Sequence, residues 1–375
     1  MAEDWGMKIS KPNVDVNQIP TVLNKKDFTI ISTEDCFLIE SANYDKFGFG
    51  NLYGLHIDSN GRIYVSDAGL HKINVFDSSL NLLFIFGGRG TGNGQFNNPV
   101  DITTDSVGNI YVVDSFNRRV QKFDSNGNYL SQFGTVGTGN GQFGNDEWTA
   151  DYGGPAGIAL DSAGNIYVVD SYNHRVQKFD SSGNYLSQFG TAGTGNGQFG
   201  TDSRYTPAGI ALDSAGNIYV VDRGNNRVQK FNSSGVYQSQ FGSYGTGDGQ
   251  FSYPNGIEID ALGNIYVADS FNCRIQKFNS SGVYQSQFGT SGSGNGQFFY
   301  PYYMAFDSSG NIYVTDSYHY RVEKFNSSGT YQSQFGQGGD GGYTVVPLAR
   351  KGVTLVISLS FIPNNYVNPT EWRVN

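Results

Sequence analysis

The stretch DSYNHRVQKF at residues 170–179 brings together three residue types that can do hydrolytic chemistry. Asp170, Ser171 and His174 are an acid, a hydroxyl nucleophile and a base, and such a set can perform nucleophilic catalysis. The same types also serve tight turns, where side-chain oxygens accept hydrogen bonds from backbone N–H groups. The surrounding elements have to decide between these two interpretations.

The composition predicts an all-β chain of many short strands. Its 375 residues include 51 Gly, and aromatic and charged residues each make up 15%. Charged residues are about 25% of an average soluble domain. Abundant Tyr, Phe, Ile and Val favour strands joined by Gly-rich turns. The net charge of -9 repels a phosphate backbone, so we expect no nucleic-acid partner.

Neither a membrane span nor a signal peptide is visible in this chain. The beginning, MAEDWGMKISKPNV, has no apolar core. The longest apolar run, VTLVISLSFI at 353–362, is too short to cross a bilayer. Low charge with abundant Asn, Gly, Ser and Tyr favours an extracellular, cell-surface or virion-exposed setting.

An internal repeat organises most of the chain. Copies of GNIYVVD and close variants begin at Gly61, Gly108, Gly164, Gly216, Gly263 and Gly310, mostly about 47 residues apart. One copy, at 209–242, divides into the strands GIALD, NIYVVD, RVQKF and VYQSQFG, with the turns DSAGN and NSSG between them. Six such units predict a six-bladed β-propeller of four-stranded antiparallel blades, with short non-repeat extensions at both ends.

The repeat resembles a known family. Residues 155–190, PAGIALDSAGNIYVVDSYNHRVQKFDSSGNYLSQFG, look like the NHL repeat, with Asn173, His174 and Arg175 at its name-giving triplet. The resemblance implies a six-bladed propeller and several functions: RNA binding on a basic face, extracellular ligand binding, or partner docking. A similar propeller, the lyase that completes peptide amidation, uses a His-rich zinc site in its channel. Here only His56 is placed near the axis.

We expect three regions along the chain. Residues 1–52 form an N-terminal extension with strand-like segments, 53–336 form the propeller, and 337–375 form a C-terminal extension. Each repeat already has four strands, so closing the ring requires no strand from either extension. The C-terminal extension could instead cap an edge or provide a strand for self-assembly.

Comparison of the copies indicates that the stretch DSYNHRVQKF has a structural role. Asp170 ends a second strand and Arg175 follows five residues later, and the pair recurs in other blades. We interpret these pairs as structural loop clamps, in which the carboxylate accepts from loop N–H groups and from the guanidinium. The five pairs are Asp114 with Arg119, Asp170 with Arg175, Asp222 with Arg227, Asp269 with Arg274, and Asp316 with Arg321.

Specific binding is expected where the copies differ, and two loops are longer than the repeat requires. GNDEWTADYGG at 144–154 and GTDSRYTP at 200–207 precede blades three and four. Strand direction puts them on the same face as the loops that follow each second strand. We predict a protein, peptide or glycan site there, made by Asp146, Glu147, Trp148, Asp151, Tyr152, Arg204, Tyr205, Phe116, Tyr172, Phe271 and Tyr318. The alternative is that these aromatic side chains pack on neighbouring loops.

The innermost strands form the second place of difference. They mostly read GIAL, but polar or bulky residues replace this pattern at His56, Asp101, Glu258 and Tyr303. These four belong to consecutive blades once the ring closes. They could meet at the channel, and His and carboxylates there could hold a calcium or zinc ion. We expect no cofactor, with a hydrated polar channel as the alternative to a metal site.

Two functions follow from these observations. The favoured one is a non-enzymatic binding or structural propeller, recognising a protein, peptide or carbohydrate or serving as a subunit of an extracellular or viral assembly. The alternative is a lyase or lactonase-like enzyme that uses a metal or polar cluster in the channel.

Overall fold

A computed structural model describes residues 21–24, 27–30, 49–144, 154–200, 208–336, 348–350 and 353–355. The chain divides into two compact units, Gly50–Phe335 and a second unit of Met1–Phe49 with Gly336–Asn375. In the second unit β1 (Thr21–Asn24) pairs antiparallel with β2 (Asp27–Ile30), and β33 (Leu348–Arg350) pairs antiparallel with β34 (Val353–Leu355). No helix in the described part of the chain is long and apolar enough to cross a bilayer.

The unit Gly50–Phe335 contains six four-stranded antiparallel sheets. Blade one has β3 (Leu52–Ile57), β4 (Ile63–Asp67), β5 (Lys72–Phe76) and β6 (Leu82–Gly87). Blade two has β7 (Pro99–Thr104), β8 (Ile110–Asp114), β9 (Arg119–Phe123) and β10 (Tyr129–Phe133). Blade three has β13 (Pro155–Leu160), β14 (Ile166–Asp170), β15 (Arg175–Phe179) and β16 (Tyr185–Phe189).

The second half of the ring repeats the pattern. Blade four has β19 (Ile210–Leu212), β20 (Ile218–Asp222), β21 (Arg227–Phe231) and β22 (Tyr237–Phe241). Blade five has β23 (Ile257–Ile259), β24 (Ile265–Asp269), β25 (Arg274–Phe278) and β26 (Tyr284–Phe288). Blade six has β29 (Pro301–Phe306), β30 (Ile312–Asp316), β31 (Arg321–Phe325) and β32 (Tyr331–Gly336).

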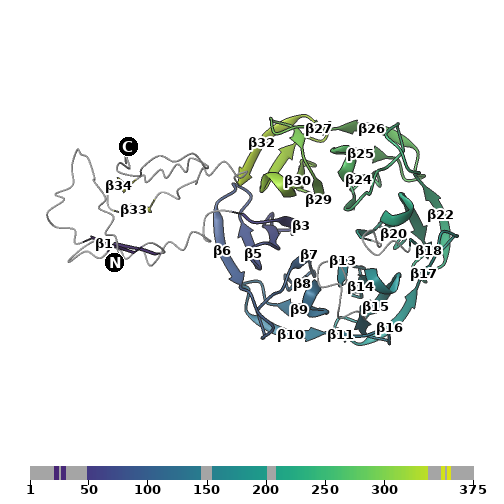
Figure 1. Cartoon of the computed structure of the whole chain (residues 1–375), viewed down its shortest axis with the longest axis horizontal. Helices are drawn as coiled ribbons and strands as arrows, with labels where there is room; N and C mark the ends of the chain where they lie inside the picture. The colour runs from purple at the N-terminus through teal and green to yellow at the C-terminus, as the bar shows by residue number, and fades with distance from the viewer. Residues whose placement is uncertain are drawn as a thin grey trace. The chain divides into compact units, whose positions relative to one another are not determined.

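Figure 1 shows the six sheets arranged around a central axis, with the first strands nearest the axis and the fourth strands on the rim. Each sheet uses four strands that are consecutive in the chain. The predicted six-bladed fold is therefore confirmed, and the ring closes without exchanging a strand between its first and last blades.

Short elements join the blades. The parallel pairs β11 (Thr135–Val136) with β12 (Gln142–Phe143), β17 (Thr191–Ala192) with β18 (Gln198–Phe199), and β27 (Thr290–Ser291) with β28 (Gln297–Phe298) lie in the Gly-rich connections. Short 3-10 turns follow five of the second strands: η3 (Ser115–Asn117), η4 (Ser171–Asn173), η5 (Arg223–Asn225), η6 (Ser270–Asn272) and η7 (Ser317–His319).

The core consists of apolar layers between neighbouring blades. Every second strand is buried at all five of its residues, because adjacent sheets cover both of its faces. Between blades three and four, for example, Tyr167 and Val169 pack with Ile218 and Val220. Burial on both faces explains why these strands lack an alternating polar pattern, and each of them pairs with the first strand that lies nearest the axis.

Candidate functional site

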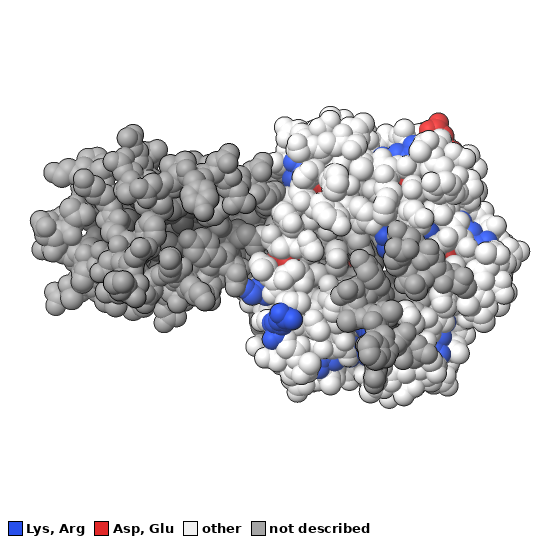
Figure 2. Space-filling model, in the orientation of Figure 1, with Lys and Arg blue, Asp and Glu red and all other residues white. Residues whose placement is uncertain are grey.

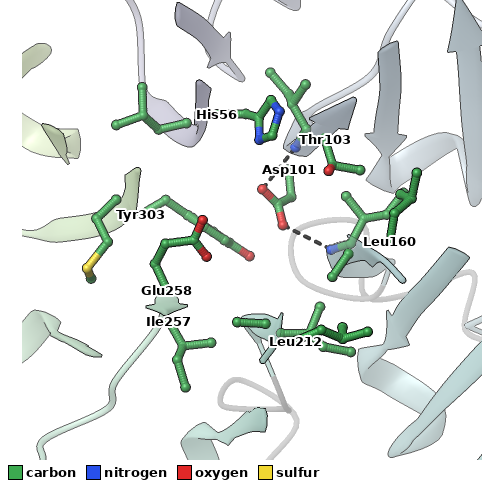
Figure 3. Close-up of a pocket in the computed structure, with 15 residues that line it drawn as sticks. His56, Asp101, Thr103, Leu160, Leu212, Ile257, Glu258 and Tyr303 are labelled. Carbon is green, nitrogen blue, oxygen red and sulfur yellow. Dashed lines mark hydrogen bonds between the residues drawn. The ribbon is translucent and has the colours of Figure 1, made fainter. Parts of the chain in front are cut away.

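The central channel contains a cavity of about 170 Å³. His56 of β3, Asp101 of β7, Glu258 of β23 and Tyr303 of β29 all line it. Figure 3 shows that their side chains point toward a common space. The structure thus brings together the four channel residues that were singled out from the sequence.

The strand register explains why these side chains meet. His56, Thr103 and Glu258 each pair with the Tyr of their own second strand, as do Ala159, Ala211 and Ala305 in the other blades. Asp101 and Tyr303 lie two residues before this position, where the other blades have Gly. Residues two apart on a strand point to the same side, so both positions face the axis.

The glycines at this register mark a close approach between blades. The Gly209 N–H donates to Asn255 O at 3.0 Å, and a Cβ on Gly209 would lie 2.6 Å from that same oxygen. Asp101 makes the corresponding link with its side chain, because its Oδ2 accepts from Ile158 N–H of blade three at 2.9 Å. The Asp101 carboxylate therefore joins two blades as well as facing the cavity.

Tyr303 places a buried phenol in the channel. Tyr303 is only 5% exposed. Its hydroxyl has no hydrogen-bond partner among the described residues. Burial and the Asp101 charge raise the pKa of Tyr303 well above its usual range, so the hydroxyl is neutral. A buried hydroxyl without a partner is destabilising, so we expect this one to bond a water molecule or a ligand in the cavity.

The ionisation of the cavity is shifted toward neutral forms. Burial raises the pKa of Asp101 to about 7, although two backbone N–H groups oppose the shift. Burial and then the Asp101 charge raise the pKa of Glu258 to about 8. Burial lowers the pKa of His56 to about 4, and its Nε2 lies 2.8 Å from Thr104 Oγ1. His56 is thus uncharged near neutral pH.

The cavity has a polar side and an apolar side. The polar groups come from blades five, six, one and two, whereas Ile158, Leu160, Ile210 and Leu212 line it from blades three and four. Neither Lys nor Arg is among its described lining residues. Arg223 acts on the Tyr303 pKa from outside the lining, and its Nη2 donates to the Tyr300 hydroxyl at 2.6 Å.

The residues present do not fit a multi-histidine zinc site. Among the described residues, no group of three or more His, Cys, Asp or Glu side chains is arranged to hold a metal ion. His56 is the one histidine of the cavity lining. His71 and His174 lie in the loops after second strands, both in the left-handed backbone region, and His319 lies in η7.

The loop clamps have the same geometry in five blades. Arg119 Nε donates to Asp114 Oδ2 at 2.7 Å, and Asn117 and Gln121 donate to the same oxygen. Asp114 Oδ1 accepts from Asn97 N–H at 2.7 Å. The Nε–Oδ2 distance is 2.7 Å in blades two to five and 3.2 Å in blade six, in the pairs Asp114 and Arg119, Asp170 and Arg175, Asp222 and Arg227, Asp269 and Arg274, and Asp316 and Arg321.

The clamp geometry settles the status of the opening stretch. Asp170 uses its Oδ2 to accept from Arg175, Asn173 and Gln177. The backbone N–H of His174 donates to Ser171 O at 3.1 Å, which closes the turn. These residues form a buried loop support rather than a nucleophile with its base.

Most of the predicted loop site lies outside the described residues, namely Asp146, Glu147, Trp148, Asp151, Tyr152, Arg204 and Tyr205. Of the remaining four, Phe116 and Tyr172 are half-buried, while Phe271 and Tyr318 are about half exposed. The face ligand and assembly through the terminal extensions both stay predictions. On the face drawn in Figure 2, Lys and Arg side chains are scattered over the blades.

An aromatic cluster that the sequence interpretation missed connects Phe271 with Tyr318. Tyr300 lies between them, with ring centroids 5.3 Å from Phe271 and 5.5 Å from Tyr318. The cluster continues through Tyr302, 5.8 Å from Tyr300 and 5.6 Å from the channel residue Tyr303. Its signal was the run QFFYPYY at 297–303, which has more aromatic residues than the other connections.

Sequence comparison finds the repeat in three segments. The NHL repeat matches residues 152–179, 205–231 and 251–278. A probable peptidyl-alpha-hydroxyglycine alpha-amidating lyase of Caenorhabditis elegans is 29% identical over 238 residues. That match covers 61% of this chain and 49% of the other, so the chain spans about half the length of this relative.

Solved structures share the fold at low sequence identity. Virginiamycin B lyase from Staphylococcus aureus has a TM-score of 0.53 at 13% identity, covering 76% of this chain and 84% of that one. A gluconolactonase from Xanthomonas campestris has a TM-score of 0.52 at 13% identity, covering 72% and 85%. A chain of the nidogen/laminin complex has a TM-score of 0.52 at 18% identity, covering 71% and 90%. The three matched segments and the ring of six four-stranded sheets show that the chain carries NHL repeats and folds as a six-bladed β-propeller.

Proposed function

We propose that this propeller binds a small polar molecule in its central channel. The observation that carries the proposal is the buried Tyr303 hydroxyl, which has no described partner and faces the cavity beside Asp101 and Glu258. A ligand with hydrogen-bonding groups would satisfy this hydroxyl and offset its burial.

The repeat pattern favours the channel, rather than the loop clamps, as the ligand-binding site. Clamp pairs of Asp and Arg recur in five blades, and each clamp Asp accepts several hydrogen bonds. The channel residues occur once each and depart from the Gly or Ala of the other blades. A single asymmetric set of polar groups can recognise one ligand in one orientation, which a six-fold repeated set cannot.

A thermal-shift and calorimetry screen tests the proposal on the full chain. The probes are glycerol, erythritol, ethanolamine, butylamine, 1-butanol and γ-butyrolactone, which differ in charge and in hydrogen-bonding groups. We expect at least one probe to raise the Tm of the wild type, because binding to the native state stabilises it. Tyr303→Phe should weaken that response at least about tenfold in Kd, which is about 1.4 kcal/mol.

Tyr318→Phe is the matched control, since Tyr318 lies on the exposed face and is 56% accessible. It should leave the response unchanged. The proposal is overturned if no probe shifts the wild type, or if Tyr303→Phe responds like the wild type.

A lactonase-like or lyase activity is the second candidate function. It is favoured by two carboxyl groups whose pKa values lie near neutrality, about 7 for Asp101 and about 8 for Glu258. Near neutral pH a carboxylate of this kind can accept a proton and a carboxylic acid can donate one. The virginiamycin B lyase and the gluconolactonase support this candidate only through their similar fold, and the amidating lyase only through a partial sequence match.

Lactone hydrolysis illustrates how the two groups would act. Asp101 would take a proton from a water molecule while the water oxygen bonds to the carbonyl carbon of the lactone. Glu258 would then give its proton to the ring oxygen as the carbon–oxygen bond breaks. Acid release from γ-butyrolactone, which is small enough for the cavity, is the measurement, and removing either group should cost about 100-fold or more in rate. Equal rates for wild type, Asp101→Asn and Glu258→Gln would reject an enzyme of this kind.

A further inference from the structure

The cavity has acidic groups without a matching positive charge. Asp101 and Glu258 line it, and its described lining contains neither Lys nor Arg. In the clamps, by contrast, each buried Asp of blades two to six has an Arg at 2.7 to 3.2 Å. A buried carboxylate is stable only when it is paired or neutralised. Protonation neutralises Glu258 and part of Asp101 in the empty cavity, and a bound cation could pair with both groups as carboxylates instead.

Three acceptor groups converge on the polar side. Asp101 and Glu258 contribute carboxyl oxygens, and Tyr303 contributes a phenolic oxygen. An ammonium group carries up to three N–H donors, which match these three acceptor groups. The same set offers no cationic donor to a carboxylate or phosphate, and therefore it disfavours anions and zwitterions.

The opposite wall separates an organic cation from a metal ion. Ile158, Leu160, Ile210 and Leu212 provide alkyl surface there, which cannot coordinate calcium or zinc. The alkyl part of an organic cation can pack against this surface. With about 170 Å³ available, and about 30 Å³ for each water molecule, the ligand has roughly four to seven non-hydrogen atoms.

We infer that the channel ligand is a small alkylammonium ion, whose charged nitrogen lies among Asp101, Glu258 and Tyr303 and whose alkyl group lies against blades three and four. This inference rests on the proposed function and names its ligand class.

Proton release gives the inference a distinctive signature. The groups that face Glu258 across the cavity are Asp101 from β7, His56 from β3 and Tyr303 from β29, while β13 and β19 present apolar side chains. The raised pKa of Glu258, about 8, keeps it largely protonated at neutral pH. Binding of a cation would favour the carboxylate and lower this pKa. The ammonium should therefore bind more tightly as the pH rises, with release of a proton.

Isothermal titration calorimetry on the full chain tests this with three probes of similar shape: butylammonium, 1-butanol and butyrate. At about pH 7 we expect butylammonium to bind at least about tenfold more tightly than 1-butanol, and butyrate to give no heat of binding. Between about pH 6 and pH 8 its affinity should rise about fivefold or more. Titrations in buffers of different ionisation enthalpy should detect the protons released, most of them from Glu258 and a smaller part from Asp101.

Glu258→Gln should weaken butylammonium at least about tenfold and reduce the proton release to the smaller part that comes from Asp101, whose pKa is raised to about 7. The matched control is Glu323→Gln, the same carboxyl-to-amide change at a buried position outside the cavity lining, which should bind like the wild type. If 1-butanol binds as tightly as butylammonium, or if Glu258→Gln keeps the ammonium affinity, the inference is overturned while channel binding stands. If none of the screened probes binds, the proposed function fails with it.

Discussion

Buried carboxylates occur in two regions of this propeller, the loop clamps and the channel, and their surroundings differ in charge. Asp222 in a clamp is fully buried and lies 2.7 Å from Arg227. Asp101 in the channel is 4% exposed and receives only backbone N–H groups. Burial is similar, but a guanidinium balances one charge and nothing in the cavity lining balances the other.

The difference distinguishes scaffold from site. In the clamps, the carboxylate, the guanidinium and the loop carbonyls satisfy one another, so the unit is complete and can recur around the ring. Burial raises the pKa of clamp carboxyls such as Asp114 as well, but there an Arg opposes the shift. In the channel no cation opposes the raised pKa values of Asp101 and Glu258, and the Tyr303 hydroxyl has no partner among the described residues. Uncompensated groups of this kind are found where a protein binds or reacts with something else.

Blade six lies between these two cases. In blade five Gln276 Nε2 donates to Gln250 O at 2.6 Å and to Asp269 Oδ2 at 3.0 Å. Blade six has Glu323 at this position, and its Oε2 accepts from Gly296 N–H at 3.0 Å, as the Gln276 amide oxygen does from Gly249 N–H. The other carboxyl oxygen of Glu323, Oε1, therefore corresponds to the Gln276 amide nitrogen, which is a donor in blade five.

The Arg321 guanidinium does not replace that donor. Its Nη2 lies 2.6 Å from Glu323 Oε1, yet it donates its hydrogens to Gly294 O and Gln297 O. Burial raises the pKa of Glu323 to about 7, and the Asp316 charge adds to this while Arg321 opposes it. A protonated Glu323 can act like the Gln of the other blades, so this clamp works best with a neutral carboxyl.

The largest effect should come from breaking a clamp. Arg227→Met leaves the Asp222 carboxylate buried without its cation, which costs about 3–5 kcal/mol. Urea denaturation measures the loss in the free energy of unfolding. Lys230→Met is the control in the same blade, because Lys230 lies 3.8 Å from Asp213 near the surface and should cost under about 1 kcal/mol. Equal losses would remove the contrast between structural clamp and surface pair.

In the channel, by contrast, the protein should be more stable when the carboxyl group of Glu258 cannot ionise. The pKa of Glu258 is raised from 4.5 to about 8, so its contribution to stability is full below about pH 4.5 and is lost as the pH rises through about 8. Glu258→Gln should match the wild type near pH 4 and exceed it by roughly 2–4 kcal/mol near pH 8.5.

Urea denaturation across this pH range measures the difference between the two proteins. The contribution of His56, whose pKa is lowered to about 4, is lost as the pH falls from about 6.5 to 4. It occurs in both proteins and cancels. A difference that does not change with pH would show that Glu258 ionises freely, and the contrast with the clamps would then disappear.

Glu323→Gln should give the clamp of blade six the same hydrogen bonds as the clamps that have Gln at this position. The pKa of Glu323 is raised from 4.5 to about 7, so its stability contribution is lost as the pH rises between these values. The variant should be more stable than the wild type by roughly 1–3 kcal/mol near pH 8 and equal near pH 4. The reciprocal Gln276→Glu should introduce a similar loss into blade five. A destabilised Glu323→Gln would mean that the carboxylate form is the native one.

The smallest effect concerns two tyrosine hydroxyls. Tyr303→Phe removes a buried hydroxyl that has no described partner, so the unliganded protein should gain about 1 kcal/mol or stay unchanged. Tyr219→Phe removes a hydroxyl that donates to Asp213 at 3.3 Å and should lose about 1 kcal/mol or less. Thermal unfolding of both variants gives the comparison. A clear loss in Tyr303→Phe would indicate a partner for this hydroxyl inside the protein.

The local pattern of residues was enough to predict the scaffold. Six copies of one sequence motif, with turn residues at fixed offsets, determine the number of blades and the strands in each. Every blade repeats the same local structure. The channel candidates His56, Asp101, Glu258 and Tyr303 could be found because they depart from a repeated Gly or Ala position. A substitution in a repeat is visible without any knowledge of distance.

Only the tertiary structure decided what those departures mean. Ionisation depends on burial and on groups that other blades supply, as with the Ile158 N–H that donates to Asp101. The unpartnered Tyr303 hydroxyl and the misplaced carboxyl oxygen of Glu323 are likewise properties of a neighbourhood. The sequence by itself determined the ring and its irregular positions. Closure of the ring brought residues of distant blades to one cavity, and electrostatic energies depend on those distances.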